Sequence, residues 1–300
     1  MNLEVFVKNS PFKNPLVLAS GTFGYGLTFS NVIEKAGAFV TKGISVKPKK
    51  GNPPPRIWDS VETVINSVGL ENVGLEEFKT RILPSIRFST PLYVNLAGVD
   101  EDEFGILIET LEDSPGISGY ELNLSCPNVK EGGAALGQSV NKVAKVTTLC
   151  RSLTSRPIWV KLTTNFCDVR ETSKAAADSG ADAVVLINTL NALVVDAKRR
   201  RPFLGSGSGG LSGPAIKPYV LYLVREVSKR IRIPIVASGG AVCGQDVRDF
   251  MLSGASLVEL GSINLVNPES LIRILKEFEE CINSEGIASP SELIGRLEER

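Results

Sequence analysis

The chain alternates between short apolar runs and longer amphipathic segments. Eight apolar runs, each bounded by Gly, Pro or polar residues, span residues 16–19, 38–44, 92–97, 120–125, 158–162, 183–188, 234–237 and 257–260. Between several of them, residues 139–153, 169–179, 218–230 and 245–253 carry apolar side chains at the spacing of one helix face. This alternation predicts repeated strand–helix units.

Eight such units predict an α/β fold of the (β/α)8 TIM-barrel type. Runs rich in Val, Ile and Leu indicate strands that are buried on both faces, as in a parallel sheet. Gly37, Gly180 and Gly254 each stand just before an apolar run, a position typical of helix ends. Closing the strands into a barrel is the economical arrangement, and an open doubly wound sheet is the alternative.

Several segments fall outside the repeated units. Residues 45–90 and 189–217 are longer than ordinary loops and follow predicted strands, so we expect long insertions at the C-terminal face, where barrel enzymes hold their active sites. Residues 2–15 are expected to form an N-terminal hairpin. Ser289 and Pro290 are expected to begin a final helix that packs outside the barrel.

Length and composition indicate one domain over residues 1–300, because 43% hydrophobic content in 300 residues suffices for one large core. The 33 basic and 33 acidic residues cancel, so no attraction to nucleic acid is expected, and the basic run 198–201 is interpreted as a solvated loop. We find neither a leader pattern nor a membrane-spanning apolar run. We therefore expect a cytoplasmic protein without membrane contact.

Histidine is absent from the sequence, which excludes catalytic groups and metal sites built on imidazole. The five cysteines lie too far apart for a zinc or iron–sulfur site, so no metal is expected. Cys126 ends an apolar strand just before a glycine-bearing loop, which favours a nucleophile or proton acceptor over a buried structural thiol. Cys150 and Cys281 are predicted to lie in the core, and Cys167 and Cys243 are interpreted as filler.

Polar or glycine residues stand at nearly every predicted strand end. They are Ser20, Lys42, Asn95, Asn123, Lys161, Asn188, Gly239, Gly240, Gly261 and Ser262. A lysine in an apolar strand is costly unless an anionic ligand or an internal carboxylate pairs with it. The asparagines suit a planar heterocycle, and the glycine pairs after strands seven and eight suit a phosphate.

These motifs resemble the dihydroorotate dehydrogenase family. The ordered set comprises ASGTFGYG, TKGI, GNPPPR, NSVGLEN, ELNLSCPNVKEGG, INTL and GGLSGPAIKP, followed by the late GG and GS pairs. The forms of SCPNVKEGG and GGLSGPAIKP are most similar to the catalytic subunit of the NAD-linked class 1B branch. The resemblance implies an FMN-containing barrel that oxidises dihydroorotate to orotate in pyrimidine (UMP) biosynthesis.

The resemblance also implies roles for particular residues. Cys126 would be the catalytic base that takes a proton from C5 of dihydroorotate as hydride leaves C6 for the flavin N5. The implied substrate contacts are Lys42, Asn66, Ser67, Val68, Gly69, Leu70, Asn123, Asn128, Asn188 and Thr189. The implied FMN contacts are Ser20, Lys42, Gly43, Asn95, Asn123, Lys161, Ile187, Gly213, Gly239, Gly240, Gly261 and Ser262. Lys161 suits the N1 and C2 edge of the flavin, where negative charge gathers on reduction.

The electrons need a further carrier to reach NAD. The chain has no closely spaced cysteine set and no GxGxxG in a strand–turn–helix setting. The resemblance implies a partner subunit that carries FAD and a [2Fe-2S] cluster, in a heterotetramer of two catalytic and two electron-transfer chains.

Other functions remain open at this stage. The nearer alternative is a class 1A-like homodimer that passes electrons directly to fumarate. A more distant one is a barrel lyase or aldolase that uses Lys42 or Lys161 as a Schiff base, with the glycine pairs holding a substrate phosphate. A non-catalytic binding barrel is disfavoured, because so many polar strand ends exceed what a scaffold needs.

Overall fold

Eight parallel strands close into a barrel in the computed structural model, which describes residues 2–125 and 136–298. The strands are β3 (Leu16–Leu18), β4 (Ala38–Val40), β7 (Leu92–Leu96), β8 (Gly119–Asn123), β9 (Ile158–Lys161), β10 (Ala183–Leu186), β15 (Ile235–Ser238) and β16 (Leu257–Leu260). Every residue of these strands is buried, as their continuous apolar runs require. The predicted barrel is confirmed, and each predicted run contains all or most of one strand.

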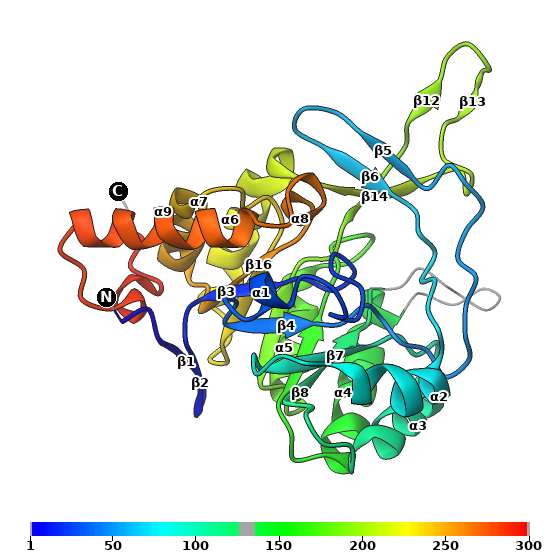
Figure 1. The fold of residues 1–300 in the computed structure, drawn as a ribbon, viewed down its shortest axis with the longest axis horizontal. Helices are drawn as coiled ribbons and strands as arrows, with labels where there is room; N and C mark the ends of the chain where they lie inside the picture. Colours follow the sequence, from blue (N-terminus) through cyan, green and yellow to red (C-terminus); the bar gives the residue numbers. More distant parts are fainter. Residues whose placement is uncertain (1, 126–135, 299–300) are drawn as a thin grey trace.

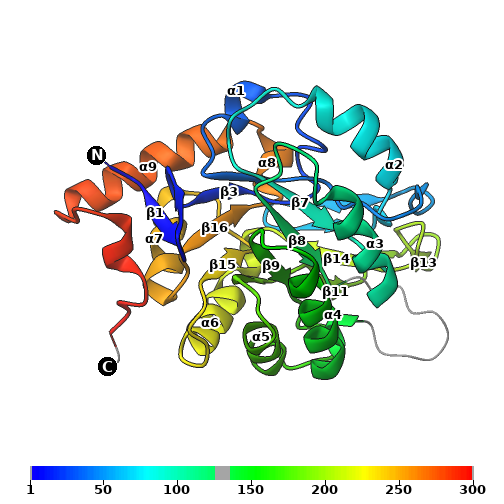
Figure 2. The same ribbon diagram turned by 90° about the horizontal axis from the view of Figure 1, so that it is seen from below.

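Helices surround the barrel on its outside (Figure 2). The longer ones are α3 (Glu101–Leu111), α4 (Val140–Leu153), α5 (Val169–Asp178), α6 (Lys217–Ser228), α7 (Gly244–Ser253) and α9 (Ser270–Ser284). Shorter pieces are α1 (Ser30–Ile33), α2 (Leu75–Glu77) and α8 (Ile263–Val266), a π turn at Phe78–Ile82, and 3₁₀ turns at Leu83–Ser85, Leu136–Gln138, Pro214–Ile216 and Pro290–Leu293. Side chains that accept a backbone N–H begin three helices: Asp100 for α3, Ser139 for α4 and Asp168 for α5.

The N-terminal hairpin packs against the end of the barrel at which the strands begin. Its strands β1 (Val5–Val7) and β2 (Ser10–Phe12) pair antiparallel, as expected. The ring of Phe12 is buried against Tyr93 of β7 and Trp159 of β9, with centroids 6.4 Å and 6.0 Å away. Tyr93 and Trp159 stack on each other at 3.8 Å. These three rings form an aromatic layer inside the barrel.

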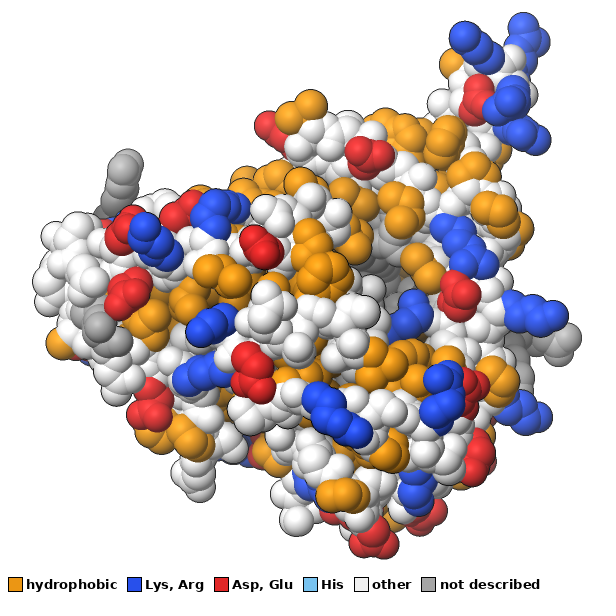
Figure 3. Space-filling model, viewed as in Figure 1, with side chains coloured by type: hydrophobic (Ala, Val, Ile, Leu, Met, Phe, Trp, Pro, Cys, Tyr) orange, Lys and Arg blue, Asp and Glu red, His pale blue; other side chains and the backbone are white. Residues whose placement is uncertain are grey.

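The two long insertions meet in one antiparallel sheet on the C-terminal side of the barrel (Figure 1). Its order is β11 (Leu190–Ala192), β14 (Gly209–Ser212), β6 (Val64–Asn66) and β5 (Ile57–Asp59). We call this sheet the roof. A small hairpin of β12 (Val195–Asp196) and β13 (Arg201–Pro202) projects beyond it, and residues 198–201 are exposed there (Figure 3). The interpretation of this basic run as solvated is confirmed.

Two local predictions are wrong. The segment after Ser289 forms only a 3₁₀ turn, because Gly295 takes a positive φ and its N–H donates to Met251 at the end of α7 instead of continuing a helix. Cys281 is only half-buried, with its Sγ near Gln245, because it lies at the edge of the apolar face of α9. Cys150 is fully buried, as predicted. Among the described residues, no helix is long and apolar enough to cross a membrane.

Candidate active site

A cavity of about 710 Å³ lies between the carboxyl ends of the barrel strands and the roof. Every described residue of the two predicted contact sets lines it, from Ser20 after β3 to Ser262 after β16. Cys126 and Asn128 lie outside the described residues. The structure thus brings the described candidates together at one site, and their individual roles stay predictions.

One wall of the cavity is a network of amide and hydroxyl groups. Ser125 donates to Oδ1 of Asn123 at 2.6 Å, and Nδ2 of Asn188 is bonded to both Ser125 and Asn123. Oδ1 of Asn188 in turn accepts the backbone N–H of Thr189 at 2.7 Å. These bonds fix which amide groups face the cavity. Ser125, which the sequence analysis did not single out, immediately precedes Cys126.

The floor of the cavity is an ion-paired cluster inside the barrel. Nζ of Lys161 lies 2.6 Å from Oε2 of Glu259 on β16 and 3.7 Å from Oε1 of Glu121 on β8. Asn95 donates from Nδ2 to the same Oε1 of Glu121 at 2.6 Å. Both glutamates are fully buried, whereas Lys161 and Asn95 also line the cavity. The predicted need of Lys161 for an anionic partner is met within the protein.

The two glutamates have opposite shifts in their pKa values. Burial and the neighbouring Glu259 carboxylate raise the pKa of Glu121 far above its usual range. Burial also opposes the charge of Glu259, but Lys161 and a hydrogen bond with Glu121 outweigh it and lower the pKa of Glu259. The same two carboxyls overcome the burial of Lys161 and raise its pKa. Of the two carboxyls, Glu121 is therefore the one that keeps a proton more readily.

Lys42 is the cation of the upper cavity. It lies just beyond β4, and no described carboxylate is within ion-pair distance of its Nζ. Burial lowers the pKa of Lys42, and the charge of Glu71 offsets this shift only in part. A half-buried ammonium without a counter-ion among the described residues is suited to an anionic ligand.

Gly239 and Gly240 form a close turn beneath the start of α6. Their φ values are 135° and 92°, a region that favours glycine. A Cβ on Gly240 would lie 2.8 Å from the backbone N of Lys217, and one on Gly239 would lie 2.9 Å from Ile216. The turn therefore requires glycine at both positions, and both line the cavity, which fits a phosphate-binding turn.

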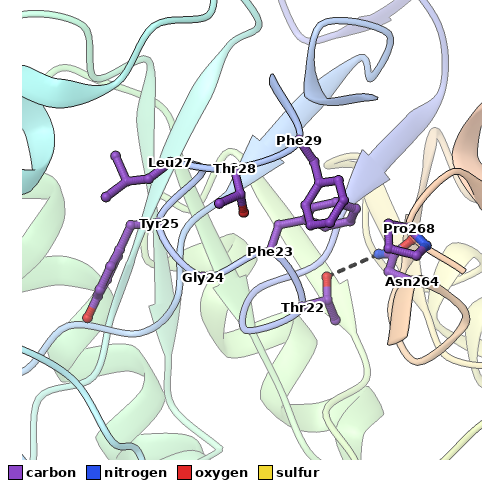
Figure 4. Close-up of a pocket in the computed structure, with 9 residues that line it drawn as sticks. All are labelled: Thr22, Phe23, Gly24, Tyr25, Leu27, Thr28, Phe29, Asn264 and Pro268. Atoms are coloured by element: carbon purple, nitrogen blue, oxygen red, sulfur yellow. Dashed lines mark hydrogen bonds between the residues drawn. The ribbon is translucent and has the colours of Figure 1, made fainter. Parts of the chain in front are cut away.

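Gly261 and Ser262 follow β16. Gly261 has room around it, since a Cβ there would meet only Ala19 at 4.0 Å. The loop after β3 is tied to α8 by a 3.0 Å hydrogen bond from Asn264 to Thr22, beside a smaller depression whose walls include Phe23 and Phe29 (Figure 4). The hydrogen bond fixes the loop after β3 against α8, which directly follows Gly261 and Ser262.

Neither Glu121 nor Glu259 is among the site residues predicted from the sequence. Each is a charged residue within an otherwise apolar run, YELNL and LVEL. This is the same signal that identified Lys161, and it could have found them. Their partnership with Lys161 could not be deduced, because the three residues come from strands far apart in the sequence.

Comparisons with known proteins give matches to one family over nearly the whole chain. Residues 2–282 match the family described as dihydroorotate dehydrogenase. A protein of Geotalea uraniireducens named "Dihydroorotate dehydrogenase B (NAD(+)), catalytic subunit" is 43% identical over 299 residues, covering 99% of this chain and 98% of that protein. A Geobacter sulfurreducens protein of the same name is 42% identical over 300 residues, with the same coverage. The structure of an Eimeria tenella protein titled as DHODH in complex with ferulenol matches with a TM-score of 0.82 at 23% identity, over 98% of this chain and 88% of that one, and supports the fold alone.

Proposed function

This chain belongs to the dihydroorotate dehydrogenase family, and from that premise we propose how its cavity works. The chain is the catalytic subunit of an NAD-linked dihydroorotate dehydrogenase, an enzyme of pyrimidine biosynthesis. We infer that the cavity binds one FMN and that dihydroorotate is oxidised to orotate above it. The observation that carries the proposal is the combination, in one cavity, of a glycine turn suited to phosphate and the buried ammonium of Lys161.

The residues present fit FMN. The phosphate would lie against Gly239, Gly240, Gly261 and Ser262, which line the cavity just beyond β15 and β16. Asn95 Oδ1 is buried without a hydrogen-bond partner among the described residues, which leaves it available to a ring N–H. Lys161 would meet the edge of the ring system. When bound, the flavin accepts hydride, and its N1–C2 edge then gathers negative charge.

The substrate would occupy the upper cavity. Lys42 would pair with its carboxylate, and the amides of Asn66, Asn123 and Asn188 would bond its ring. Leu70 and Gly69 both take positive φ, at 54° and 76°, so the loop of residues 66–70 turns sharply where it lines the cavity. The hydrogen bonds among Asn123, Ser125 and Asn188 orient these amides before the substrate arrives.

Cys126 would take the proton from C5 of the substrate. It follows Ser125, whose hydroxyl is held at the cavity wall by Asn123. A free thiol has a pKa of about 8.5, so the thiolate has to be favoured by its surroundings or by the bound substrate. Asn128 would be a further substrate contact.

Electrons would leave through a partner. We propose a cytoplasmic heterotetramer of two such chains and two electron-transfer subunits, which carry FAD and a [2Fe-2S] cluster. The name of the relatives, a catalytic subunit linked to NAD, supports a separate electron-transfer chain.

The test is the spectrum of the purified chain. It should be yellow, release about one FMN per chain on denaturation, and be bleached by dihydroorotate. Dye reduction should need the chain alone, whereas NAD reduction should need co-expression with the iron–sulfur flavoprotein. Fumarate reduction by the chain alone would favour the homodimeric branch. A colourless protein trapped on substrate by borohydride would favour a Schiff-base lyase instead.

A further inference from the structure

Lys161 lies between the cavity and two carboxyl groups that the chemistry above does not use. Its Nζ is 2.6 Å from Glu259 and 3.7 Å from Glu121, while its side chain is only 7% exposed. Among the described residues, these two glutamates are the charged groups that face it. The net charge of Lys161, Glu121 and Glu259 therefore acts directly on a ligand that lies over Lys161 in the cavity.

The hydrogen bonds of the cluster indicate how many protons it holds. Oε2 of Glu121 and Oε1 of Glu259 are both buried and have no described hydrogen-bond donor. Two adjacent carboxyls that each have one oxygen to spare are suited to share a proton between those oxygens. The remaining oxygens already accept from Asn95 and Lys161. With one proton between them, the glutamates carry a single negative charge against one ammonium.

We propose that Glu121 and Glu259 act as a pair of positioning residues that holds one negative charge and one proton beneath Lys161, and so sets the reduction potential of the flavin. The inference rests on the proposed function, because it concerns the edge of the bound flavin. Lys161 stays charged and in place, yet its charge is balanced when the flavin is oxidised. The balance limits how strongly the site favours the reduced, anionic flavin.

The pair is redundant, and this yields a distinctive pattern of variants. In Glu121→Gln, Glu259 still carries the charge. In Glu259→Gln, Glu121 loses its proton and takes over the charge opposite Lys161. Only the double variant leaves Lys161 without a counter-ion inside the barrel, where its pKa must fall. Both substitutions keep the shape of the side chain, so a purely structural role would be little disturbed.

The experiment measures the flavin reduction potential of the wild type, both single variants and the double variant across pH 6 to 9. The potential reports the ratio of the dissociation constants of oxidised and reduced flavin. We expect each single variant to change this ratio by less than about threefold. The double variant should change it by more than tenfold, or about 30 mV for a two-electron couple. Its potential should exceed that of the wild type at acid pH and fall below it at alkaline pH.

Two other patterns would overturn the proposal. If each single variant raises the potential and the two effects add, both carboxyls are ionised and no proton is shared. If all four proteins have the same potential at every pH, the cluster does not act on the flavin.

Urea unfolding of the FMN-free proteins gives a second measurement. In the double variant, Lys161 binds fewer protons in the folded protein than in the unfolded protein. The free energy of unfolding of this variant should therefore rise with pH between the lowered pKa of Lys161 and about 10.4. The single variants should show no such rise, and its absence in the double variant would contradict the charge count. If no protein binds FMN, the proposed function fails, and the unfolding measurement alone decides the proton count.

Discussion

Asp246 on α7 is bonded to Lys217 at the start of α6, with 2.5 Å between Oδ1 and Nζ. Its other oxygen accepts the backbone N–H groups of Val242 and Cys243. One carboxylate thus links the loop that follows Gly239 and Gly240 to the helix that overlies it. The proposed phosphate turn depends on this link for its shape.

Asp246→Ala should therefore weaken FMN binding. The change leaves two backbone N–H groups without their acceptor, at a cost of about 1–3 kcal/mol each if they stay buried. It also removes one of the two carboxylates that pair with Lys217. We expect at least a tenfold higher dissociation constant, measured by quenching of FMN fluorescence. Asp249→Ala is the matched control, because Asp249 also pairs with Lys217 but is not bonded to the loop. Equal losses of FMN affinity in the two variants would mean that FMN binding depends on the pairing of Lys217 and not on the shape of the loop.

Lys42→Gln should lower the affinity for orotate. A hydrogen bond to a charged group contributes about 1.5–3 kcal/mol, which corresponds to roughly 10- to 100-fold in the dissociation constant. Because the pKa of Lys42 is lowered, the affinity of the wild type should fall as the pH rises through that pKa, and the variant should lack this step. Lys47→Gln, at an exposed position outside the cavity, serves as the control. An unchanged pH dependence in Lys42→Gln would remove Lys42 from the substrate site.

Cys126→Ala should retain FMN and bind orotate but slow the reduction of the flavin by dihydroorotate. Loss of a positioned general base costs about 10²- to 10⁴-fold in rate. Cys126→Ser should keep a small activity that rises with pH, since a hydroxyl is a poorer base. Stopped-flow bleaching of the flavin measures this step without a partner subunit, with Cys281→Ser as the control. Bleaching of the alanine variant at the wild-type rate would make Lys42 the next candidate.

Phe12→Ala should destabilise the barrel by about 3–5 kcal/mol, because it empties part of the aromatic layer formed with Tyr93 and Trp159. Phe6→Ala in the same hairpin should change the free energy of unfolding by less than about 0.5 kcal/mol, because Phe6 is 53% exposed. Urea unfolding of both variants measures the difference. Similar values for the two would show that the hairpin is not part of the core.

The barrel and the position of its site could be predicted because both depend on local patterns. Continuous apolar runs identify strands that are buried on two faces, and the residue that ends each run necessarily lies at the C-terminal edge. Lys161 and Gly240 could be found in this way. The resemblance to a known family added Asn66 and Thr189, which lie in insertions without such a pattern.

Features that depend on distant partners could not be predicted. Glu259 meets Lys161 across the barrel, and no local spacing relates the two positions. The roof arises from pairing between β6 and β14, which lie in the two long insertions. No pattern within either insertion predicts that the two pair with each other. The final turn was mistaken for a helix because its capping residues are favourable, whereas the bonds of Gly295 and Leu297 to the end of α7 redirect the chain.

The roof has a consequence for the order in which the molecule assembles and opens. Pairing of Ile65 with Leu211 joins segments that are separated along the chain by half of the barrel strands, β7 to β10. Ordering so long an intervening chain is entropically costly until the barrel itself has closed, so we expect the roof to form last. Its short, half-buried strands should also be the first to exchange their amide hydrogens, while the barrel strands stay protected. We therefore expect the roof to open as a separate unit, so that ligands enter and leave the cavity while the barrel strands stay paired.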